Sequence, residues 1–465
     1  MVTSTDERPI VLVSNRGPVS FERADDGTLT SRRGAGGLVS GIGPLVAGTD
    51  TTWLAAAITD GDREAATGGI VEADDFRVAM LAIDPETYRL GYDVVSNEVL
   101  WFAHHGLWNR VHEPSFDHTW ADAWDAYRAM NHAFADVVAE VAEPDAVVLV
   151  QDYHLCLVAA RLAKLRPDLA CVHFSHTPFA PPGWLAMLPE ATVQELLHGL
   201  AAHRACGFHA TRWATDFADS AQALAGLKPT SFVAPLASDP DDIRRAAATP
   251  ECAAALAELD ALVGDRAVIG RVDRMELSKN HVRGFRAFGE LLERHPEHRE
   301  RVVFVAEAYP SREGVPGYAT YQAEVDRAVA EVNERWGTST WTPIEIDTED
   351  DHARSVALLR RADVLLVNPI RDGLNLVASE GALVNERDAV LALSPEAGAW
   401  ERLHTGLLTV PPFDVAGTAE VLHQALTMPA AARSDLAARL RVLAEARTPR
   451  HWLADQLAAA ATTPL

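Results

Sequence analysis

Short runs of apolar and β-branched residues recur along the chain and alternate with longer amphipathic stretches rich in Ala and Leu. The first run, Pro9 to Ser14 (PIVLVS), is typical of a parallel strand that is buried on both faces. Similar runs follow at Ala146–Val150, Ala170–Phe174, Ser231–Ala234, Ala267–Ile269, Val302–Val305 and Val364–Val367. Helical patterns lie between them, for example at Asp122–Glu140 and Arg283–Arg294. This alternation predicts an α/β fold with parallel sheets.

The segment Ala234–Asp241 (APLASDPD) is the best candidate for a domain boundary because it is rich in Pro and Asp. A helical pattern follows it at Asp242–Leu262. The 465 residues therefore predict two α/β domains of comparable size, 1–236 and 237–465, whose parallel sheets face a central cleft. The Ala-rich tail Ala430–Ala461 predicts a packed helix, and the last helix either stays in the second domain or crosses back to the first. Ligands of such folds bind at the carboxyl ends of strands.

The charge balance and the cysteines exclude several classes of protein. With 41 basic and 66 acidic residues the net charge is −25, whereas a nucleic-acid-binding protein needs a basic face. An acidic surface repels phosphorylated ligands at long range, so we expect any phosphate site to be a local basic pocket. The scattered Cys156, Cys171, Cys206 and Cys252 favour neither a zinc site nor a disulfide framework. The N-terminal apolar run is too short for a membrane span, and we expect a cytoplasmic protein that binds no membrane.

Glycines follow the first predicted strand in two places. Ser14-Asn15-Arg16-Gly17-Pro18 comes directly after the strand, and a second segment ends in Gly36-Gly37-Leu38. A Gly-Gly pair before an apolar helix lets backbone N–H groups approach a phosphate closely, and Arg16 would lie near the ligand. The alternative is an ordinary loop with a surface arginine, since Gly-rich loops are common.

Polar residues follow two further strands of the first domain. Gln151-Asp152-Tyr153-His154 comes after one strand, and His176 follows the end of the next. Because the carboxyl ends of parallel strands share one edge of a sheet, we expect these side chains near a ligand. The alternatives are a helix-capping role for Asp152 and a core position for His176.

In the second domain, Gly270–Asn280 (GRVDRMELSKN) holds Arg274 and Lys279 in a loop before a helix. The helix dipole disfavours two cations there unless they meet an anion, for which a diphosphate is the natural hypothesis. The alternative is a solvated charge pair.

The segment Asn368–Glu380 (NPIRDGLNLVASE) follows another strand of the second domain. Its Asp372-Gly373 turn would direct backbone N–H groups of the next helix toward an anion. Glu380, about two helical turns later, can accept two ribose hydroxyls. The alternative is an ordinary turn followed by a solvated glutamate.

Eight ordered segments resemble the signature of the trehalose-6-phosphate synthase family of retaining glycosyltransferases. They are SNRGPV, GAGGL, YDVVSNEVLW, QDYHL, HTPF, RMELSKN, PSREGVPGY and DGLNLVASE, and they place the resemblance from about Val11 to Met428. The resemblance implies a GT-B fold with two Rossmann-like domains and needs neither a cofactor nor a metal. It implies transfer of glucose from UDP- or GDP-glucose to glucose 6-phosphate in trehalose biosynthesis.

The resemblance also implies roles for single residues that bind the donor. Arg274 and Lys279 match the family's diphosphate-binding pair, Glu380 its ribose-binding carboxylate, and His176 the histidine that lies over the donor glucose. The remaining donor positions, which hold the sugar and the phosphate, match Gly36, Gly37, Asp372, Gly373, Leu374, Asn375 and Leu376.

On the acceptor side, the matched positions are Arg16, Tyr92, Trp101, Asp152 and Arg312, with the arginines on the phosphate. The implied mechanism is front-face substitution, in which a donor phosphate oxygen accepts the acceptor's proton as the C–O bond breaks. Arg274 and Lys279 would stabilise the charge that grows on the leaving diphosphate, and His176 and Asp152 complete the predicted catalytic set.

Several positions depart from the synthase pattern. Ala56 stands where synthases usually carry a second tryptophan, which we expect to open space beside the acceptor ring, and Asn280 replaces a glycine. The segments at 210–213 (ATRW) and 383–389 (LVNERDA) look closer to validoxylamine 7′-phosphate synthase, which couples a nucleotide cyclitol to an amino-cyclitol phosphate.

Three alternatives to trehalose 6-phosphate synthesis therefore stay open. They are the cyclitol coupling, transfer to another phosphorylated acceptor such as glycerol 3-phosphate, and a silent sugar-phosphate sensor. The intact set of Arg274, Lys279, Asp372 and Glu380 argues against a sensor. The sequence leaves open the choice between UDP and GDP and the oligomeric state, a homo-oligomer included.

Overall fold

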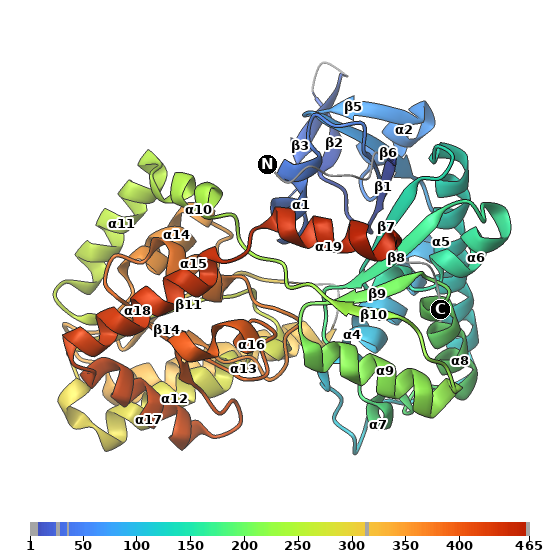
Figure 1. Cartoon of the computed structure of the whole chain (residues 1–465). Helices are drawn as coiled ribbons and strands as arrows, with labels where there is room; N and C mark the ends of the chain where they lie inside the picture. The colour runs from blue at the N-terminus through green and yellow to red at the C-terminus, as the bar shows by residue number, and fades with distance from the viewer. Residues whose placement is uncertain (1–7, 25–27, 35–36, 312–315, 462–465) are drawn as a thin grey trace. The chain divides into compact units, whose positions relative to one another are not determined.

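The structure, a computed structural model, describes residues 8–24, 28–34, 37–311 and 316–461 (Figure 1). The chain divides into two units. Unit 1 comprises the described residues up to Leu236 together with the segment that begins at Pro449, and unit 2 comprises Ala237–Thr448. Among the described residues, no helix combines the length and the apolar composition needed to cross a membrane.

Unit 1 is built on an eight-stranded sheet of order β10-β9-β8-β7-β1-β4-β6-β5. All neighbouring strands pair in parallel except β5, which is antiparallel to β6. The strands are β1 (Ile10–Val13), β4 (Thr52–Ala56), β5 (Ile70–Ala73), β6 (Phe76–Leu81), β7 (Val147–Gln151), β8 (Ala170–Ser175), β9 (Ala205–Phe208) and β10 (Ser231–Val233). A separate hairpin joins β2 (Val19–Arg23) to β3 (Leu29–Arg33).

Helices connect these strands, as the alternating pattern predicts. They are α1 (Gly37–Val46), α2 (Asp60–Ala65), α3 (Pro85–Tyr88), the π-helix η2 (Arg89–Leu100), α4 (Trp101–His105), α5 (Thr119–Val141), α6 (Val158–Leu165), α7 (Pro182–Leu185), α8 (Glu190–Ala201), α9 (Thr211–Ala225) and α19 (Pro449–Ala461). The last of these, α19, packs against β7, β8, β9 and α1 (Figure 1). Its Trp452 and Gln456 are fully buried there.

Unit 2 is built on a six-stranded, all-parallel sheet of order β13-β12-β11-β14-β15-β16. Its strands are β11 (Ala267–Val272), β12 (Val302–Glu307), β13 (Ile344–Asp347), β14 (Val364–Val367), β15 (Val390–Leu393) and β16 (Leu408–Thr409). Its helices are α10 (Pro240–Ala247), α11 (Pro250–Val263), α12 (His281–Arg294), α13 (Pro316–Trp336), α14 (His352–Arg361), α15 (Val377–Val384), α16 (Trp400–Leu403), α17 (Val415–Thr427) and α18 (Ala430–Glu445). Each strand predicted from the sequence lies in one of the two sheets.

Two predicted helices are each split by a proline. The helix expected at Asp242–Leu262 consists of α10 and α11, and the tail helix expected at Ala430–Ala461 consists of α18 and α19. Pro250 and Pro449 stand at the first position of the second helix in each case. Proline has no N–H for a helical hydrogen bond and is tolerated only in the first turn, so each helix ends and a new one begins.

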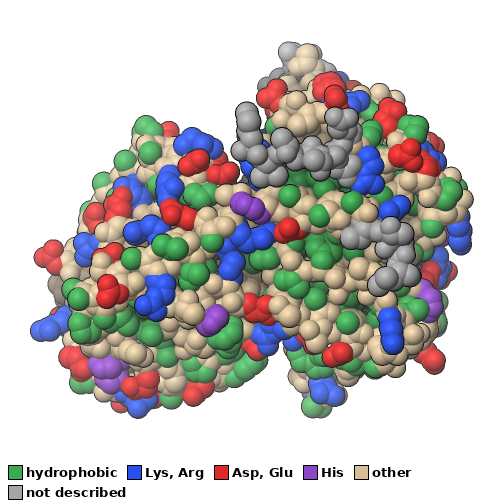
Figure 2. Space-filling model, in the orientation of Figure 1, with side chains coloured by type: hydrophobic (Ala, Val, Ile, Leu, Met, Phe, Trp, Pro, Cys, Tyr) green, Lys and Arg blue, Asp and Glu red, His purple; other side chains and the backbone are tan. Residues whose placement is uncertain are grey.

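Surface charges are mixed on both units. On the face drawn in Figure 2, acidic, basic and hydrophobic side chains are interspersed. The four cysteines are free and buried. On this face the acidic side chains are not gathered into one patch.

Several histidines are buried in unit 1, among them His173 on β8, His203 after α8 and His209 after β9. Burial disfavours the charged imidazolium and lowers the pKa of His203 to about 4 and that of His209 to about 3. Burial also lowers the pKa of His173 well below its ordinary value. These rings are therefore neutral in the folded protein near neutral pH.

We expect the free energy of unfolding to fall as the pH drops below about 6.5, the ordinary pKa of histidine. In that range the histidines are protonated in the unfolded chain but stay neutral in the folded chain. Each of them lowers the free energy of unfolding by up to about 1.4 kcal/mol per pH unit. In His203→Gln the slope of the free energy of unfolding against pH should be smaller by an amount that corresponds to at most one proton. Urea unfolding at several pH values between 7.5 and 5 measures it, with the exposed His112→Gln as control. An equal slope in His203→Gln and the wild type would contradict the assignment.

Candidate active site

Four adjacent strands of unit 1 end in polar residues at one edge of the sheet. Arg16 comes after β1, Asp152 after β7, His176 after β8 and His209 after β9, and these strands are neighbours in the order β9-β8-β7-β1. Because the strands are parallel, their carboxyl ends meet at the same edge, where α/β proteins bind ligands. The structure thus places the predicted Arg16, Asp152 and His176 at one edge of the sheet, together with His209, which was not predicted.

The backbone of Asp152 is strained. Its φ of 73° and ψ of 168° lie in a region that is essentially restricted to glycine and costs about 1–3 kcal/mol. Hydrogen bonds hold it at its N–H, its carbonyl and its carboxylate. The N–H donates to Phe174 O (2.7 Å), and the carboxylate accepts from the N–H of His176 (3.1 Å). The carbonyl accepts from His173 Nε2 (3.1 Å) and from the N–H of Leu155 (3.2 Å). The side chain makes no helix-capping hydrogen bond, so the capping alternative is wrong.

His176 lies in a directional chain of hydrogen bonds. The N–H of Leu236 donates to His209 Nδ1 (3.2 Å), so the proton of His209 is on Nε2 and is donated to His176 Nδ1 (3.2 Å). The proton of His176 is then on Nε2 and is donated to Gln151 Oε1 (3.0 Å). Gln151 in turn donates through Nε2 to Gln456 Oε1 on α19 (3.1 Å).

This chain fixes both the tautomer and the charge of His176. Burial lowers the pKa of His176 well below its ordinary value, and the neighbouring His209 lowers it further. His176 is therefore a neutral imidazole with its proton on Nε2. The sequence placed Gln151 and His176 after neighbouring strands, but it did not show that Gln151 and His209 orient His176, and it gave no signal for His209.

The predicted aromatic residues come from η2 and α4, the segment that precedes the strand-end loops. Tyr92 stacks on Tyr88 (5.1 Å between ring centroids) and on His154 (5.3 Å), two residues after Asp152. Trp101 is buried, stacks on His105 at 3.8 Å and lies 5.9 Å from Tyr153. The structure therefore places Tyr92 and Trp101 against the loop that contains Asp152.

Arg16 is exposed, and its backbone is fixed by its neighbours. Ser14 Oγ donates to the carbonyl of Arg16 (2.7 Å) and accepts from the indole N–H of Trp53 (2.7 Å). Asn15 donates to the hydroxyl of Tyr88 (2.9 Å). Gly37 is the first residue of α1, while Gly36 and Arg312 lie outside the described residues.

Ala56 is the last residue of β4 and lies beside this group, because its N–H donates to the carbonyl of Asn15 (3.1 Å). It is only 3% exposed and belongs to the hydrophobic core of unit 1. Ala56 is therefore buried in the core of unit 1, and the space expected beside the acceptor ring stays a prediction.

In unit 2, Lys279 is held between two carboxylates from adjacent strands. Its Nζ lies 2.7 Å from Asp372 Oδ2, in the loop after β14, and 3.3 Å from Asp273 Oδ1, after β11. Burial alone would lower the pKa of Lys279, but the carboxylates of Asp372 and Asp273 outweigh it and raise the pKa above its ordinary value. The ammonium is therefore charged and fixed in place.

Arg271, near the end of β11, makes hydrogen bonds and an ion pair with residues of this ion cluster. Its side chain is fully buried and donates to Asn368 Oδ1 (2.7 Å), to Asp273 Oδ2 (3.3 Å) and to the carbonyl of Lys279. A buried guanidinium is stable only when its donors are paired, and here its partners are the loops that carry the site. The sequence analysis did not identify Arg271 as a site residue.

Arg274, the second predicted cation, is half exposed and pairs with a buried carboxylate. Its Nη1 lies 3.1 Å from Glu276 Oε1, which also accepts from Ser311 Oγ (3.1 Å). The expectation that two cations in this loop need a ligand anion is thus incomplete, because Arg274 and Lys279 already meet carboxylates of the protein itself.

The loop before α15 completes the group. Asn375 has a left-handed φ of 76° and donates to Asp372 Oδ2 (3.3 Å). The turn is fixed by hydrogen bonds from Asp372 N to Glu396 O (3.0 Å) and from Ala399 N to Leu374 O (2.9 Å). Gly373 and Leu376 belong to the same loop, and Leu376 is the residue before α15.

Glu380 lies on α15, where Ser238 Oγ donates to its Oε1 at 3.5 Å. Burial raises the pKa of Glu380 to about 7, and the Ser238 hydroxyl acts in the opposite direction. This glutamate is not the solvated helix residue of the alternative interpretation, because it is half-buried and has a hydroxyl as its neighbour.

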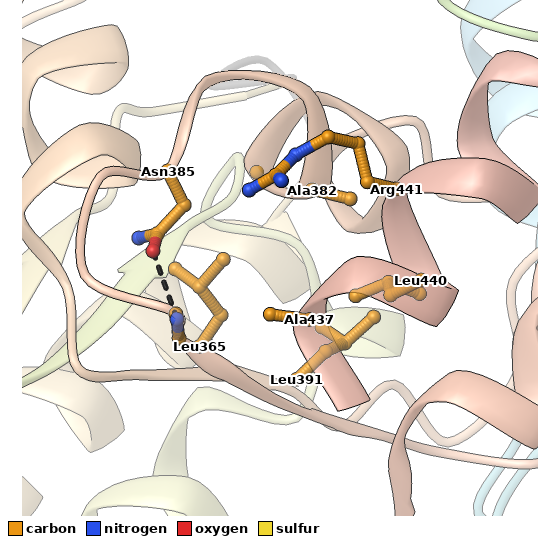
Figure 3. Close-up of a pocket in the computed structure, with 9 residues that line it drawn as sticks. Leu365, Ala382, Asn385, Leu391, Ala437, Leu440 and Arg441 are labelled. Carbon is orange, nitrogen blue, oxygen red and sulfur yellow. Dashed lines mark hydrogen bonds between the residues drawn. The ribbon is translucent and has the colours of Figure 1, made fainter. Parts of the chain in front are cut away.

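A separate small cavity in unit 2 is unrelated to this chemistry. It is lined mainly by apolar side chains of α15, α18, β14 and β15, with Asn385 and Arg441 at its rim (Figure 3). Asn385 is engaged by the backbone, since its Oδ1 accepts from the N–H of Ala389 (2.8 Å). None of the predicted site residues lines this cavity.

Comparison with known proteins places the chain among glycosyltransferases. A probable UDP-forming α,α-trehalose-phosphate synthase of Arabidopsis thaliana is 31% identical over 447 residues, which cover 92% of this chain. The match spans only 54% of that relative, so the chain corresponds to about half of its length.

Two solved structures match over the whole length. An E. coli trehalose-6-phosphate structure bound with UDP-2-fluoro glucose has a TM-score of 0.85 at 27% identity and covers 98% of this chain and 100% of its own. A UDP-forming synthase of Burkholderia xenovorans in complex with glucose-6-phosphate has a TM-score of 0.84 at 26% identity, with the same coverage. These matches confirm the predicted GT-B fold class and the resemblance to the synthase family. The model of glycosyltransferase family 20 matches residues 8–462, and the chain belongs to that family.

Proposed function

We propose that this chain transfers glucose from UDP-glucose to glucose 6-phosphate with retention of configuration, forming trehalose 6-phosphate. The observation that carries the proposal is the fixed ammonium of Lys279 between Asp372 and Asp273, at the ends of β11 and β14. It is a preorganised positive charge at the edge of a parallel sheet where a nucleotide diphosphate binds. The relatives support it, since one similar structure holds a UDP-sugar and another holds glucose 6-phosphate.

On the donor side, we assign the leaving diphosphate to Lys279 and Arg274. An ammonium has three N–H donors, one more than the two carboxylates in contact with Lys279 require, and the third can point to a phosphate oxygen. Glu380 would accept the ribose hydroxyls, and the loop from Asp372 to Leu376 would hold the sugar and the phosphate. As the C–O bond breaks, negative charge grows on the diphosphate, and fixed cations stabilise that charge without reorganisation.

On the acceptor side, we assign the phosphate of glucose 6-phosphate to Arg16, and to Arg312 as the family resemblance implies. Tyr92, Trp101 and Asp152 would line the sugar ring. The neutral His176 would donate its Nε2 proton to the donor sugar in place of Gln151, which accepts that proton in the structure. The acceptor hydroxyl would attack the anomeric carbon on the face from which the diphosphate leaves, and a donor phosphate oxygen would take the hydroxyl proton. The reaction then needs neither a protein carboxylate as nucleophile nor a protein base.

Nucleotide release and product mass test the proposal directly. We expect UDP release from UDP-glucose only with a phosphorylated acceptor, a disaccharide phosphate as product with glucose 6-phosphate, and activity that persists in EDTA. GDP-glucose, glycerol 3-phosphate and an amino-cyclitol phosphate complete the panel and decide between the alternatives. Faster turnover with a cyclitol phosphate would favour the cyclitol coupling, and no release with any pair would favour a sensor. Loss of activity in EDTA that magnesium restores would contradict the metal-free mechanism.

Lys279→Ala and Arg274→Ala should each lower kcat by roughly 10²–10³, or about 2.7–4 kcal/mol, with a much smaller effect on the KM for glucose 6-phosphate. The reason is that these cations act on charge that develops only in the transition state. Steady-state kinetics with both substrates measure the effect. Arg286→Ala, which removes an exposed arginine of α12 in the same unit, is the matched control. An unchanged kcat in both variants would mean that other groups stabilise the leaving diphosphate.

Glu380 should make donor binding pH-dependent. Below its pKa of about 7 the side chain gains a proton and loses acceptor capacity, so the KM for the donor should rise as the pH falls from 8 to 6. Glu380→Gln should weaken donor binding by about 1.5–3 kcal/mol, or roughly 10- to 150-fold, and abolish this pH step. Initial rates at saturating glucose 6-phosphate measure both effects. The same pH step in Glu380→Gln would assign the titration to another group.

A further inference from the structure

Three histidines and two glutamates meet in unit 2 where α12 and the turn η5 (Pro296–His298) pack beside α17. They are His295, Glu297, His298, Glu420 and His423. The proposed transfer reaction uses none of them. His298 and His423 are 125 residues apart in the sequence, which is why a search for spaced metal ligands along the chain does not find the group.

Three of these side chains offer donor atoms that converge. One ring nitrogen of His295, one of His423 and a carboxylate oxygen of Glu297 all lie within 4.8 Å of one another. His295 Nδ1 lies 3.6 Å from Glu297 Oε1. The rings of His295 and His423 are stacked with centroids 3.7 Å apart and planes 9° from parallel.

The outer nitrogens of both histidines are already engaged. His295 Nε2 donates to Glu420 Oε1 (3.1 Å), which leaves the lone pair on Nδ1, the nitrogen that faces Glu297. His423 Nδ1 lies 3.0 Å from His298 Nε2, and when it donates there its lone pair is on Nε2. Metal-binding histidines have this arrangement, in which the second nitrogen donates to a carboxylate or another acceptor.

The donor types select the kind of ion. Two imidazoles and one carboxylate suit zinc and similar transition metals, while calcium and magnesium prefer oxygen ligands alone. Arg294 Nη1 lies 2.9 Å from Glu420 Oε1 and neutralises that carboxylate, so Glu297 is left as the anionic ligand. We propose that His295, Glu297 and His423 bind one zinc ion, with Glu420 and His298 as the groups that orient the two histidines.

Binding requires only a local adjustment. Ligand bonds of about 2.0–2.2 Å in a tetrahedral site place donor atoms roughly 3.3–3.6 Å apart. His295 Nδ1 and Glu297 Oε1 already lie 3.6 Å apart, and donors at the 4.8 Å limit must close by up to about 1.5 Å. The side chain of Glu297 is 54% exposed and free of packing constraints, whereas that of His295 is 19% exposed. Glu297 can therefore move toward the ion while the two rings tilt out of their stack.

The ion would connect the end of α12 to α17. The opposite end of α12 follows Asn280, whose side chain donates to the carbonyls of Asn368 (2.9 Å) and Pro412 (2.7 Å) beside the Lys279 cluster. A helix of 14 residues is about 21 Å long, so the ion lies too far from Lys279 to act on the transferred sugar. We expect it to stabilise unit 2, and removing it with EDTA is compatible with continued turnover.

Isothermal titration of the EDTA-treated and dialysed full chain with ZnCl2 tests this site without any activity assay. We expect one zinc ion per chain, a higher melting temperature with zinc, and weaker binding at pH 6 than at pH 7.5 because protons compete for the imidazoles. His295→Ala and His423→Ala should abolish the binding. Glu420→Gln should weaken it by about 10- to 100-fold, as expected for a group that orients a ligand.

His352→Ala, which removes an exposed histidine of the same unit, is the control and should bind as the wild type does. Circular dichroism without zinc shows whether each variant is folded. Visible absorption of the Co²⁺ form gives a second readout, since tetrahedral Co²⁺ absorbs strongly. Absence of zinc binding in the wild type, or equal binding in folded His295→Ala and His423→Ala, would overturn the proposal.

Discussion

The ammonium of Lys279, fixed by Asp372 and Asp273, connects the loop after β11 to the loop after β14 in unit 2. Asp273 follows β11 and Asp372 follows β14, and these strands are neighbours in the sheet. Burying such charges is costly unless each has a partner, and the fully buried Arg271 beneath them supplies further pairing. Removing one of these charged side chains would leave buried charges without a partner. The contacts that hold Lys279 in position therefore also keep it charged.

In unit 1, neutral groups instead of charged ones fix the orientation of a site residue. His176 gains its orientation from a chain of hydrogen bonds that runs from Leu236 through His209 to Gln151 and Gln456. In this chain each imidazole proton has one acceptor, so no charge has to be buried and the tautomer is defined. The strained backbone of Asp152 persists because hydrogen bonds hold its N–H, its carbonyl and its carboxylate, which is typical of a residue at a functional site.

The two units therefore differ in how they prepare for a ligand. Unit 2 offers fixed charges, which suit a diphosphate whose negative charge grows during the reaction. Unit 1 offers hydroxyl-binding and aromatic groups, such as Tyr92 stacked on His154, together with the exposed guanidinium of Arg16. This division agrees with a donor that carries the leaving group and an acceptor that is recognised by its ring and its phosphate.

The sequence by itself determined the alternation of strands and helices, the parallel sheets and the loops after β1, β7, β8, β11 and β14, because buried strands need continuous apolar runs and the polar residues behind them stand out. It did not show that each of two continuous helical patterns is divided into two helices, at Pro250 and at Pro449. Only the tertiary structure decided the partners: Arg271 under Lys279, His209 and Gln151 around His176, the burial of Ala56, and the grouping of His295 with His423. The physical reason is that hydrogen bonds, ion pairs and desolvation act between residues that are far apart in the chain, and a single sequence carries no record of which of them meet.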